Sequence, residues 1–560
     1  MRPAPDSASS PAHGLTPPPA PAPTARQALR EGALAAWAVV VASWGVGWLP
    51  LTTPSSVFSG TTILTPLRVG FVPVTACAVL LAVGSLLMVR AWLRLGRALQ
   101  GRWEAAGPVV RRAAWAWSLP FLLAFPVFSR DVYSYLQQGR LLSLGLDPYQ
   151  HGVSALGGWF MHGADSIWAE SPSPYGPLFL VFATGVWRLT GGQVELSVTL
   201  FRLLALAGLA LCLWALPRLA EASGRSASWA VWVCLVNPLF LLYMVAGVHN
   251  DSLMTGLMLV GLVLLMRAGR RRVLRLWGLV AVALSVAIKP LTVLALPFVA
   301  MLLPTGDAHF RPGTQTRMRR RERIGPWITT AAVALAVMTI LGAGTGLWFG
   351  WVPAMATSGS AAFPYAPVGL LGLGLGWAVD AVSTVPARTV ASGFYTLMIV
   401  AALGFTVWMA LRRTPRHPVY ATALCLLVAV VAAPIIQPWY FLWVMPLLAC
   451  APRPLPGTAD HPRWLGWVTA AAALALIGAG VVDQLSVAQW LPLALIRCVN
   501  AVVVLVGIWW IVRRDASTAP LFPRGRGRPP RETIEPRRPL PAPAPARTTL
   551  PASAPRLDQE

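Results

Sequence analysis

The chain has 560 residues, of which 56% are hydrophobic and only 12% are charged, and its mean hydropathy is +0.61. Apolar stretches recur from about residue 33 to residue 512, and each is long enough to cross a hydrocarbon core of about 30 Å. This composition excludes a water-soluble globule, a collagen-like fibre and a disordered chain. It predicts an all-α, polytopic transmembrane helical bundle.

The net charge of +25 comes from 45 basic and 20 acidic residues, and Lys289 is the only lysine. The arginines gather in short segments between the apolar runs and in the C-terminal tail. Positive flanks of this kind set the orientation of a membrane protein, whereas a nucleic-acid site gathers them on one face. Membrane lipid is therefore an expected partner, and nucleic acid is not.

Proline-rich composition predicts disorder at both ends, over residues 1–32 and 513–560, and leaves a transmembrane domain at 33–512. Arginine-rich segments at 90–112, 267–275, 311–323 and 412–416 mark the inside, which places both termini in the cytoplasm. An alternating path through these points predicts about fourteen crossings. The expected spans are 34–51, 70–90, 113–129, 197–216, 228–246, 252–268, 274–288, 291–304, 326–347, 391–411, 418–435, 437–450, 465–482 and 490–512.

Two further apolar stretches, at 176–190 and 366–384, are expected to form interfacial or re-entrant helices on the outer face. A long outer loop at 130–196 holds several acidic residues, and ionisable groups at a membrane boundary are costly unless they pair or act. The six cysteines lie singly and form no CxxC pair, so neither a zinc site nor a disulfide framework is indicated.

The densest polar segment runs from Phe128 to Arg140, where the third span reaches the outer face. Two interpretations stay open there. Asp131 can act as a general base with Arg130 or Arg140 as a phosphate clamp. Alternatively, Arg130 and Asp131 are neighbours at a helix end, and the tyrosines form an aromatic belt.

A second polar group is His249, Asn250 and Asp251, between two apolar spans. These residues either line a polar cleft, or Asn250 or Asp251 caps the next helix. Lys289 either binds a phosphate headgroup or snorkels to the interface.

Two turns complete the candidates. Residues 171–177 form a rigid Pro/Gly turn that holds Tyr175 and is typical of a loop. Residues 437–443 place Gln437 and Trp439 at the outer boundary, either as belt residues or for stacking on sugar or lipid. No phosphate-binding, dinucleotide-binding or zinc-protease motif stands out, so soluble nucleotide use lacks support.

These pieces, in this order, resemble the actinobacterial polyprenyl-phosphomannose-dependent α-1,6-mannosyltransferases, integral-membrane glycosyltransferases of the GT-C class. The closer likeness is to the branch that builds the mannan backbone of lipomannan. The matching stretches are SRDVYSYLQQGRLLSLGLDPY at 129–149, PSPYGPLF at 172–179, VNPLFLLYMVAGVHNDSLM at 236–254, AIKP at 287–290 and QPWYFLW at 437–443.

The resemblance implies an enzyme of the plasma membrane whose active site faces outward. Its donor would be polyprenyl-phosphate-mannose, and its acceptor a mannan or lipomannan glycolipid. Inversion at C1 would need one base, Asp131, with Asp251 as the second choice. The leaving phosphate would need positive charge, and no cofactor or metal is expected. The expected phosphate-binding residues are Arg130, Arg140, His249 and Lys289, and the expected sugar- or lipid-binding residues are Tyr133, Tyr135, Tyr175, Asn250, Asp251, Gln437 and Trp439.

Other classes stay open at this point. A transporter or flippase of lipid-linked sugar would share the helices, but it should show an internal repeat or polar residues at mid-membrane, and neither is visible. Another GT-C enzyme, arabinosyl- or protein O-mannosyltransferase, would differ in its acceptor, which the pattern does not reveal.

Overall fold

The computed structural model describes residues 24–51, 53–303, 319–357, 366–412, 416–452, 461–484 and 491–522. Every regular element in these ranges is a helix, and none is a strand, so the all-α fold class is confirmed. The described residues as far as Leu521 form one compact unit. Most of both predicted tails, at 1–23 and 523–560, lies outside the described residues.

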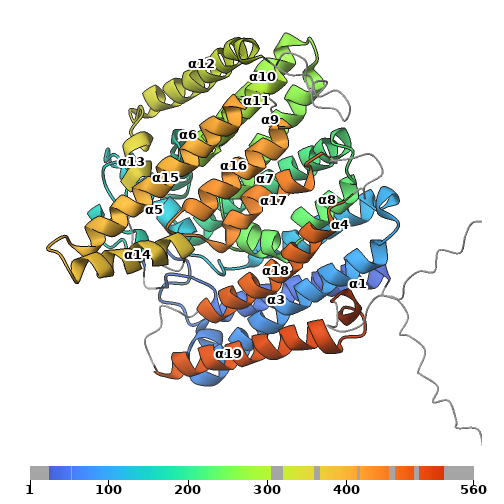
Figure 1. The fold of residues 1–560 in the computed structure, drawn as a ribbon. Helices are drawn as coiled ribbons and strands as arrows, with labels where there is room; N and C mark the ends of the chain where they lie inside the picture. The colour runs from blue at the N-terminus through green and yellow to red at the C-terminus, as the bar shows by residue number, and fades with distance from the viewer. Residues whose placement is uncertain are drawn as a thin grey trace, which may run out of the picture. The chain divides into compact units, whose positions relative to one another are not determined.

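Eight helices of the described chain are long and apolar enough to cross a membrane, and they coincide with eight of the expected spans. Figure 1 shows most of them running side by side. They are α1 (Ala25–Val46), α3 (Phe71–Leu99), α7 (Val194–Ala222), α9 (Asp251–Ala268), α12 (Arg320–Thr345), α15 (Ala387–Leu411), α18 (Arg463–Asp483) and α19 (Leu491–Trp509) continued by the π-helix η11 (Trp510–Arg514).

The other six expected spans form shorter elements, so the count of fourteen crossings and the side of each terminus stay predictions. Proline interrupts several of them, because it lacks an N–H and collides with the preceding turn. These elements are α4 (Gly107–Ser118) with η2 (Leu119–Leu123), α8 (Ala227–Cys234) with the π-helix η5 (Phe240–Ala246), α10 (Arg272–Ile288), η6 (Pro290–Ala295) with α11 (Leu296–Val299) and η7 (Ala300–Leu302), α16 (Pro418–Ala432), and η10 (Pro438–Tyr440) with α17 (Phe441–Ala449).

The two leftover apolar stretches are helical. Each forms a helix of 14 residues, shorter than the roughly 20 residues that a crossing needs. The remaining elements are α2 (Thr65–Arg68), η1 (Trp103–Ala105), α5 (Asp131–Ser143), η3 (Val153–Ala155), η4 (Ser166–Trp168), α6 (Pro177–Thr190), α13 (Trp351–Thr357), α14 (Pro367–Asp380) and η12 (Ala519–Leu521).

The expected N-terminal disorder is wrong for residues 24–32, because α1 begins at Ala25. A capping box starts this helix: Thr24 Oγ1 accepts from the Gln27 N–H at 3.2 Å, and Gln27 Oε1 accepts from the Thr24 N–H at 3.0 Å. At the other end, η11 and η12 carry ordered structure to Leu521, beyond the expected boundary at 513.

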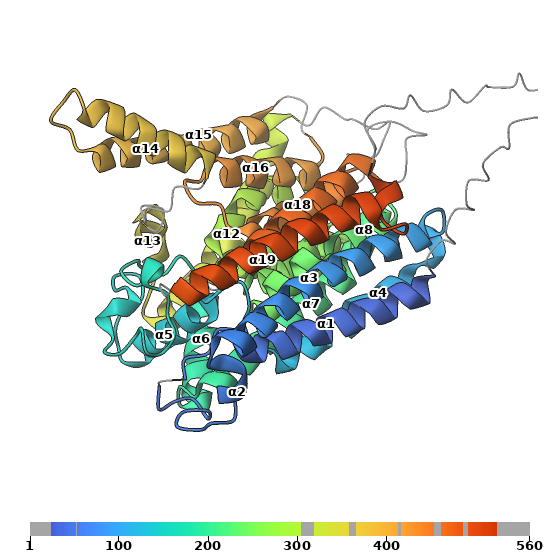
Figure 2. The ribbon, with the colours of Figure 1, turned by 90° about the horizontal axis from the view of Figure 1, so that it is seen from below.

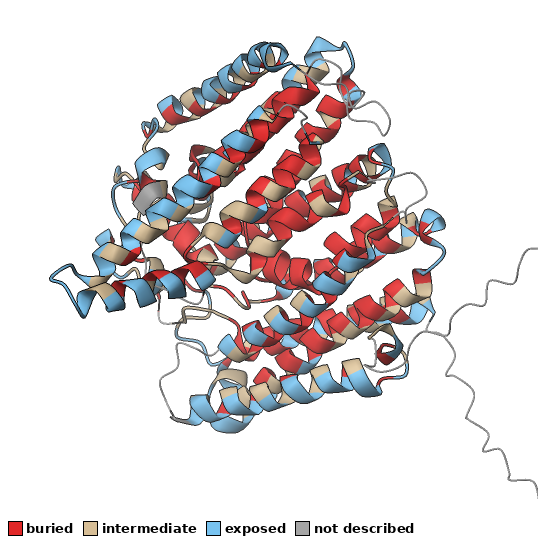
Figure 3. Cartoon of the chain, viewed as in Figure 1, coloured by how far each residue is buried: buried red, intermediate tan, exposed pale blue. Residues whose placement is uncertain are grey.

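The helices pack closely where small residues meet. A Cβ at Gly261 of α9 would lie only 2.7 Å from the carbonyl oxygen of Gly278 in α10, so the two backbones touch as in other membrane bundles. By contrast, α12 and α15 expose most of their apolar side chains, including Ile340 and Leu397 (Figure 3). Exposed apolar faces on helices of this length are what a lipid-facing surface requires.

The segments expected on the outside gather at one end of the long helices. Helices α5, α6, α13 and α14 lie together at that end (left in Figures 1 and 2). The C-terminal end of α3 lies at the opposite end, where Arg90 and Arg94 pair with Glu31, and Arg90 Nε also contacts Asp515 Oδ2 at 2.8 Å. The helices therefore separate an arginine-rich end from an end that holds α5.

Candidate active site

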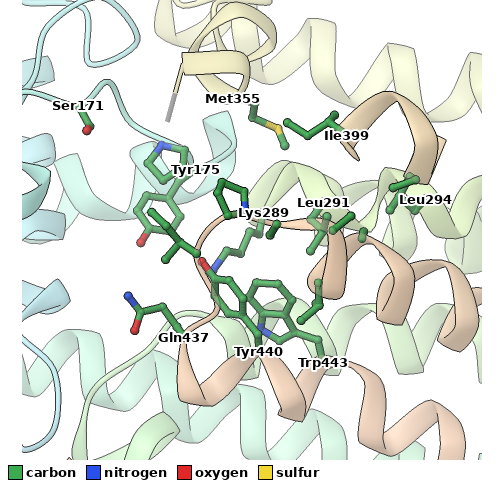
Figure 4. Close-up of a pocket in the computed structure, with 18 of the residues that line it drawn as sticks. Ser171, Tyr175, Lys289, Leu291, Leu294, Met355, Ile399, Gln437, Tyr440 and Trp443 are labelled. Carbon is green, nitrogen blue, oxygen red and sulfur yellow. The ribbon is translucent and has the colours of Figure 1, made fainter. Parts of the chain in front are cut away.

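A cavity of about 520 Å³ opens at the α5 end of the helices. Its walls come from α5, the turn at 171–175, the start of η6, and helices α15 to α17. The close-up in Figure 4 shows side chains of the 171–175 turn, Lys289, η6, α15 and the 437–443 segment converging on one space. Residues more than 300 positions apart in sequence therefore form one site.

The cavity has a polar end and an apolar end. Asp131 and Lys289 are the two charged residues of its described lining, and Ser134, Gln138 and Gln437 add neutral polar groups. The apolar part belongs to η6, α15 and α16. Its side chains include Leu291, Val293, Leu294, Ile399, Val400, Leu403, Val430 and Ile435.

Asp131 is the first residue of α5, and its side chain is 15% exposed. Its Oδ2 lies 3.6 Å from Nε2 of His249, which is fully buried. The other ring nitrogen, Nδ1, lies 2.6 Å from the carbonyl oxygen of Tyr243 and must donate to it. Nε2 is thereby directed at the carboxylate, and the His249 ring packs on Trp439 with centroids 4.0 Å apart.

An irregular backbone holds His249 in this position. The π-helix η5 ends at Ala246, and Val248 has a φ of +61°, a left-handed conformation that is unfavourable for a β-branched residue. A Cβ at Gly247 would lie 2.5 Å from the same Tyr243 carbonyl oxygen, so this position admits only glycine. Strained residues and π-helices both concentrate at functional sites.

Lys289 forms a second charged pair. Its Nζ lies 2.7 Å from Oδ1 of Asp251, a carboxylate with no exposed surface, and the indole N–H of Trp443 donates to the same oxygen at 2.7 Å. The ammonium also faces the rings of Tyr175, Tyr440 and Trp443, with its Nζ 4.5–5.6 Å from their centroids (Figure 4).

Local sequence explains where Lys289 points. Pro290 ends α10, because a residue before proline is driven out of the helical region, and Lys289 is extended with φ −141° and ψ 108°. The turn at 171–177 docks on the same helix end: the Gly176 N–H donates to the Ile288 carbonyl at 3.0 Å. The turn is thus a loop element that also places the Tyr175 ring beside Lys289.

The described residues contain no group of three or more His, Cys, Asp or Glu side chains that could hold a metal ion. Independence from metals and cofactors stays a prediction.

Residues 29–305 match a family model described as α-(1→6)-mannopyranosyltransferase, N-terminal domain. A probable α-(1→6)-mannopyranosyltransferase of Mycolicibacterium smegmatis is 34% identical over 66% of this chain and 70% of its own length. The α-(1→6)-mannopyranosyltransferase A of Mycobacterium tuberculosis is 34% identical over 69% and 74%. This chain belongs to that family. The corresponding enzyme A of Corynebacterium glutamicum is 30% identical over 68% of the chain and 79% of its own. No solved structure matches.

Membership makes the protein a glycosyltransferase, which settles the choice between an enzyme and a transporter. The mannosyltransferase brings five of its expected site residues into the cavity wall. They are Asp131, Tyr175, Lys289, Gln437 and Trp439.

Three expected residues lie behind the wall. His249 and Asp251 contact the wall residues Asp131 and Lys289, as described above. Asn250 is at the N-cap of α9 but makes no side-chain capping bond, and both of its polar side-chain atoms are buried without a partner among the described residues. The capping interpretation therefore fails for the Asn250 side chain, and Asp251 makes its bonds to Lys289 and Trp443 instead.

Four expected residues do not line the cavity. Arg130 donates to the carbonyl oxygens of Gly163 and Ala164 at 2.8–3.2 Å and packs on the Trp48 ring, and burial lowers its pKa. Its Nε and Nη2 donors are used within the fold, and the side chain does not line the cavity, which argues against a phosphate clamp there. Arg140 lies near the other end of α5 and donates to Gln137 and Gly157.

The two tyrosines of α5 are packing residues in this structure. Tyr133 is buried, its hydroxyl donates to the Trp48 carbonyl at 2.5 Å, and burial raises its pKa. Tyr135 is buried edge-on against Tyr175 and Phe179. They support the site of the mannosyltransferase without lining the cavity.

The sequence analysis missed several lining residues. Ser134 and Gln138 follow Asp131 by three and seven positions, a spacing that puts them on one helix face, so periodicity alone could have found them. Trp443 and Tyr440 lie within the QPWYFLW stretch at 437–443, but no role was predicted for them. No sequence feature distinguishes Trp168 of η4 from other tryptophans in loops, so it was not predicted to line the cavity.

Proposed function

We propose that this enzyme transfers mannose from polyprenyl-phosphate-mannose to a growing mannan or lipomannan glycolipid at the outer face of the plasma membrane. The observation that carries the proposal is one cavity with an apolar wall, one ammonium and one carboxylate. The apolar wall formed by η6, α15 and α16 suits a polyprenyl chain. Lys289 suits the single negative charge of a phosphodiester.

The proposed orientation of the protein in the membrane follows from the distribution of its arginine residues. The cavity lies at the end opposite Arg90 and Arg94, and arginine-rich ends face the cytoplasm. A lipid-linked sugar donor is reachable from the outer face, so the enzyme needs no nucleotide sugar there. The α-(1→6) linkage follows the names of the family and of its relatives.

The reaction inverts C1 in a single displacement. Asp131 accepts the proton of the acceptor 6-hydroxyl as that oxygen attacks C1, and the C1–O bond to phosphate breaks. The electron pair of that bond leaves with polyprenyl phosphate, whose growing negative charge Lys289 stabilises. Nε2 of His249 lies 3.6 Å from one oxygen of Asp131 and pairs with it when the imidazole is protonated. Gln437 and Trp439 line the same end and suit contacts with sugar.

The test uses membranes that contain the wild type or Asp131→Asn at equal protein level. They are incubated with radiolabelled polyprenyl-phosphate-mannose and a short α-1,6-mannoside. The expected result is elongation by the wild type and a loss of at least about 10²-fold in the variant, the lower end for removal of a general base. Linkage is checked by α-mannosidase digestion.

Asp380→Asn is the matched control, because Asp380 is an exposed aspartate at the C-terminal end of α14 and does not line the cavity. It should retain full activity. Equal elongation by wild type and Asp131→Asn would remove Asp131 as the base. No elongation by the wild type would refute the donor or the acceptor.

A further inference from the structure

We propose that Asp251 is a positioning residue, which fixes the Lys289 ammonium at the cavity wall without touching either substrate. This inference rests on the proposed function, because it assigns Lys289 to the donor phosphate. It also replaces the alternative in which Asp251 is the catalytic base.

Asp251 has no access to the cavity. Its side chain has no exposed surface, and it is absent from the cavity lining that contains both Asp131 and Lys289. Lys289 and Trp443 both donate to Oδ1, while Oδ2 is buried with no hydrogen-bond partner among the described residues. A base must reach the proton it removes, and only Asp131 meets that condition.

The surroundings of Lys289 explain why it needs a carboxylate. Three aromatic rings and the end of α10 exclude water from the ammonium, whose side chain is only 12% exposed. A carboxylate in direct contact offsets the loss of water around such a cation. The other titratable groups facing this space are the phenols of Tyr175 and Tyr440 and the carboxylate of Asp131 on the cavity wall. Among the residues that the structure describes, Asp251 is the one carboxylate in ion-pair contact with Nζ.

The ammonium retains donors for the substrate. It carries three N–H groups, and the bond to Asp251 uses one of them. Because Lys289 also lines the cavity, the remaining donors can meet a phosphate oxygen there. Asp251 therefore sets the direction of Lys289, and the neighbouring indole N–H of Trp443 fixes the carboxylate itself.

The kinetic test compares Asp251→Asn, Lys289→Met and the double variant in membranes, with Asp380→Asn as the control. Asp251→Asn should lower kcat/KM for the donor at least about tenfold, because a displaced Lys289 holds the donor phosphate less well and stabilises the leaving phosphate less well. The double variant should be no worse than Lys289→Met, since Asp251 acts through the lysine.

A second readout needs no activity. Lys289 is the only lysine, so its acetylation by acetic anhydride is followed on a single peptide by mass spectrometry. Acetylation should be at least about tenfold faster in Asp251→Asn than in the wild type, because the variant no longer holds Nζ in the ion pair. Polyprenyl phosphate without mannose should slow acetylation in the wild type.

Unchanged acetylation in Asp251→Asn, or an unchanged kcat/KM for the donor, would overturn the proposal. If Asp251→Asn does not accumulate, recovery of the double variant to the level of Lys289→Met would support the pair, and its failure to recover would refute it. If the wild type transfers no mannose, the proposed function is refuted. The acetylation rates of the wild type and Asp251→Asn still test whether Asp251 positions Lys289.

Discussion

Gly176 offers a sharp test of how the 171–177 turn supports the site. A Cβ at this position would lie 2.3 Å from the carbonyl oxygen of Ala287 and 2.5 Å from its carbonyl carbon. Ordinary van der Waals contact begins at 3.4 Å, so Gly176→Ala must move the turn from α10 by about 1 Å. The backbone of Gly176 has ordinary φ and ψ values, so the effect is one of space alone.

Two contributions lower the free energy of unfolding of Gly176→Ala. Overpacking against a backbone that does not move costs about 1–3 kcal/mol, and the lost Gly176–Ile288 hydrogen bond adds about 1 kcal/mol. The Tyr175 ring moves with the turn, away from the ammonium that lies 5.6 Å from its centroid. A displacement of 1 Å at a site costs up to about 10²-fold in rate.

The assay measures thermal unfolding in detergent and kcat/KM for the donor, with Gly185→Ala as the control. Gly185 is in α6, a few residues beyond the turn, and a Cβ there would meet nothing within 4 Å. Gly176→Ala should melt several degrees lower and lose up to about 10²-fold in kcat/KM. Gly185→Ala should melt no lower than the wild type, because alanine favours a helix interior, and should keep its kcat/KM. Equal behaviour of the two variants would show that the contact with α10 does not position the turn.

Two further variants separate roles within the site. His249→Gln should lower kcat by about 10–10²-fold at saturating donor, because it removes the imidazole beside Asp131 together with its bond to the Tyr243 carbonyl and its packing on Trp439. An unchanged kcat would show that the imidazole does not position Asp131. Arg130→Ala should reduce stability by about 1.5–3 kcal/mol through its lost carbonyl contacts. Its donor KM should not change, and a raised donor KM in a folded variant would restore Arg130 as a phosphate clamp.

The sequence predicted the long helices well because their signal is local. Eight runs of sufficient length and hydropathy became eight helices. The shorter spans were less predictable, since a proline such as Pro290 breaks a helix without shortening the apolar run around it. The start of α1 was missed although Thr24 and Gln27 have the spacing of a capping box, because proline-rich composition outweighed that local signal.

The site was predictable as a set of segments but not as a set of contacts. Arg130 and Asp131 are adjacent, yet successive residues at the start of a helix point about 100° apart. One reaches the carbonyl oxygens of Gly163 and Ala164, and the other reaches the cavity. Asp131 and Asp251 show a second limit of the sequence, since a buried counter-ion and a catalytic carboxylate look alike in sequence. Only the packing of α9 against α10 and α17 tells them apart.

The lone lysine links composition to chemistry. The other 44 Lys or Arg positions are arginine, and most of them gather in the segments expected on the cytoplasmic side, where charge alone is needed. At position 289 the cation must fit between three aromatic rings and a buried carboxylate and still present donors to the cavity. A compact ammonium with rotatable donors meets these conditions, whereas a planar guanidinium has a fixed fork that needs more room. The departure from arginine at this one position is therefore explained by the geometry of the pair with Asp251.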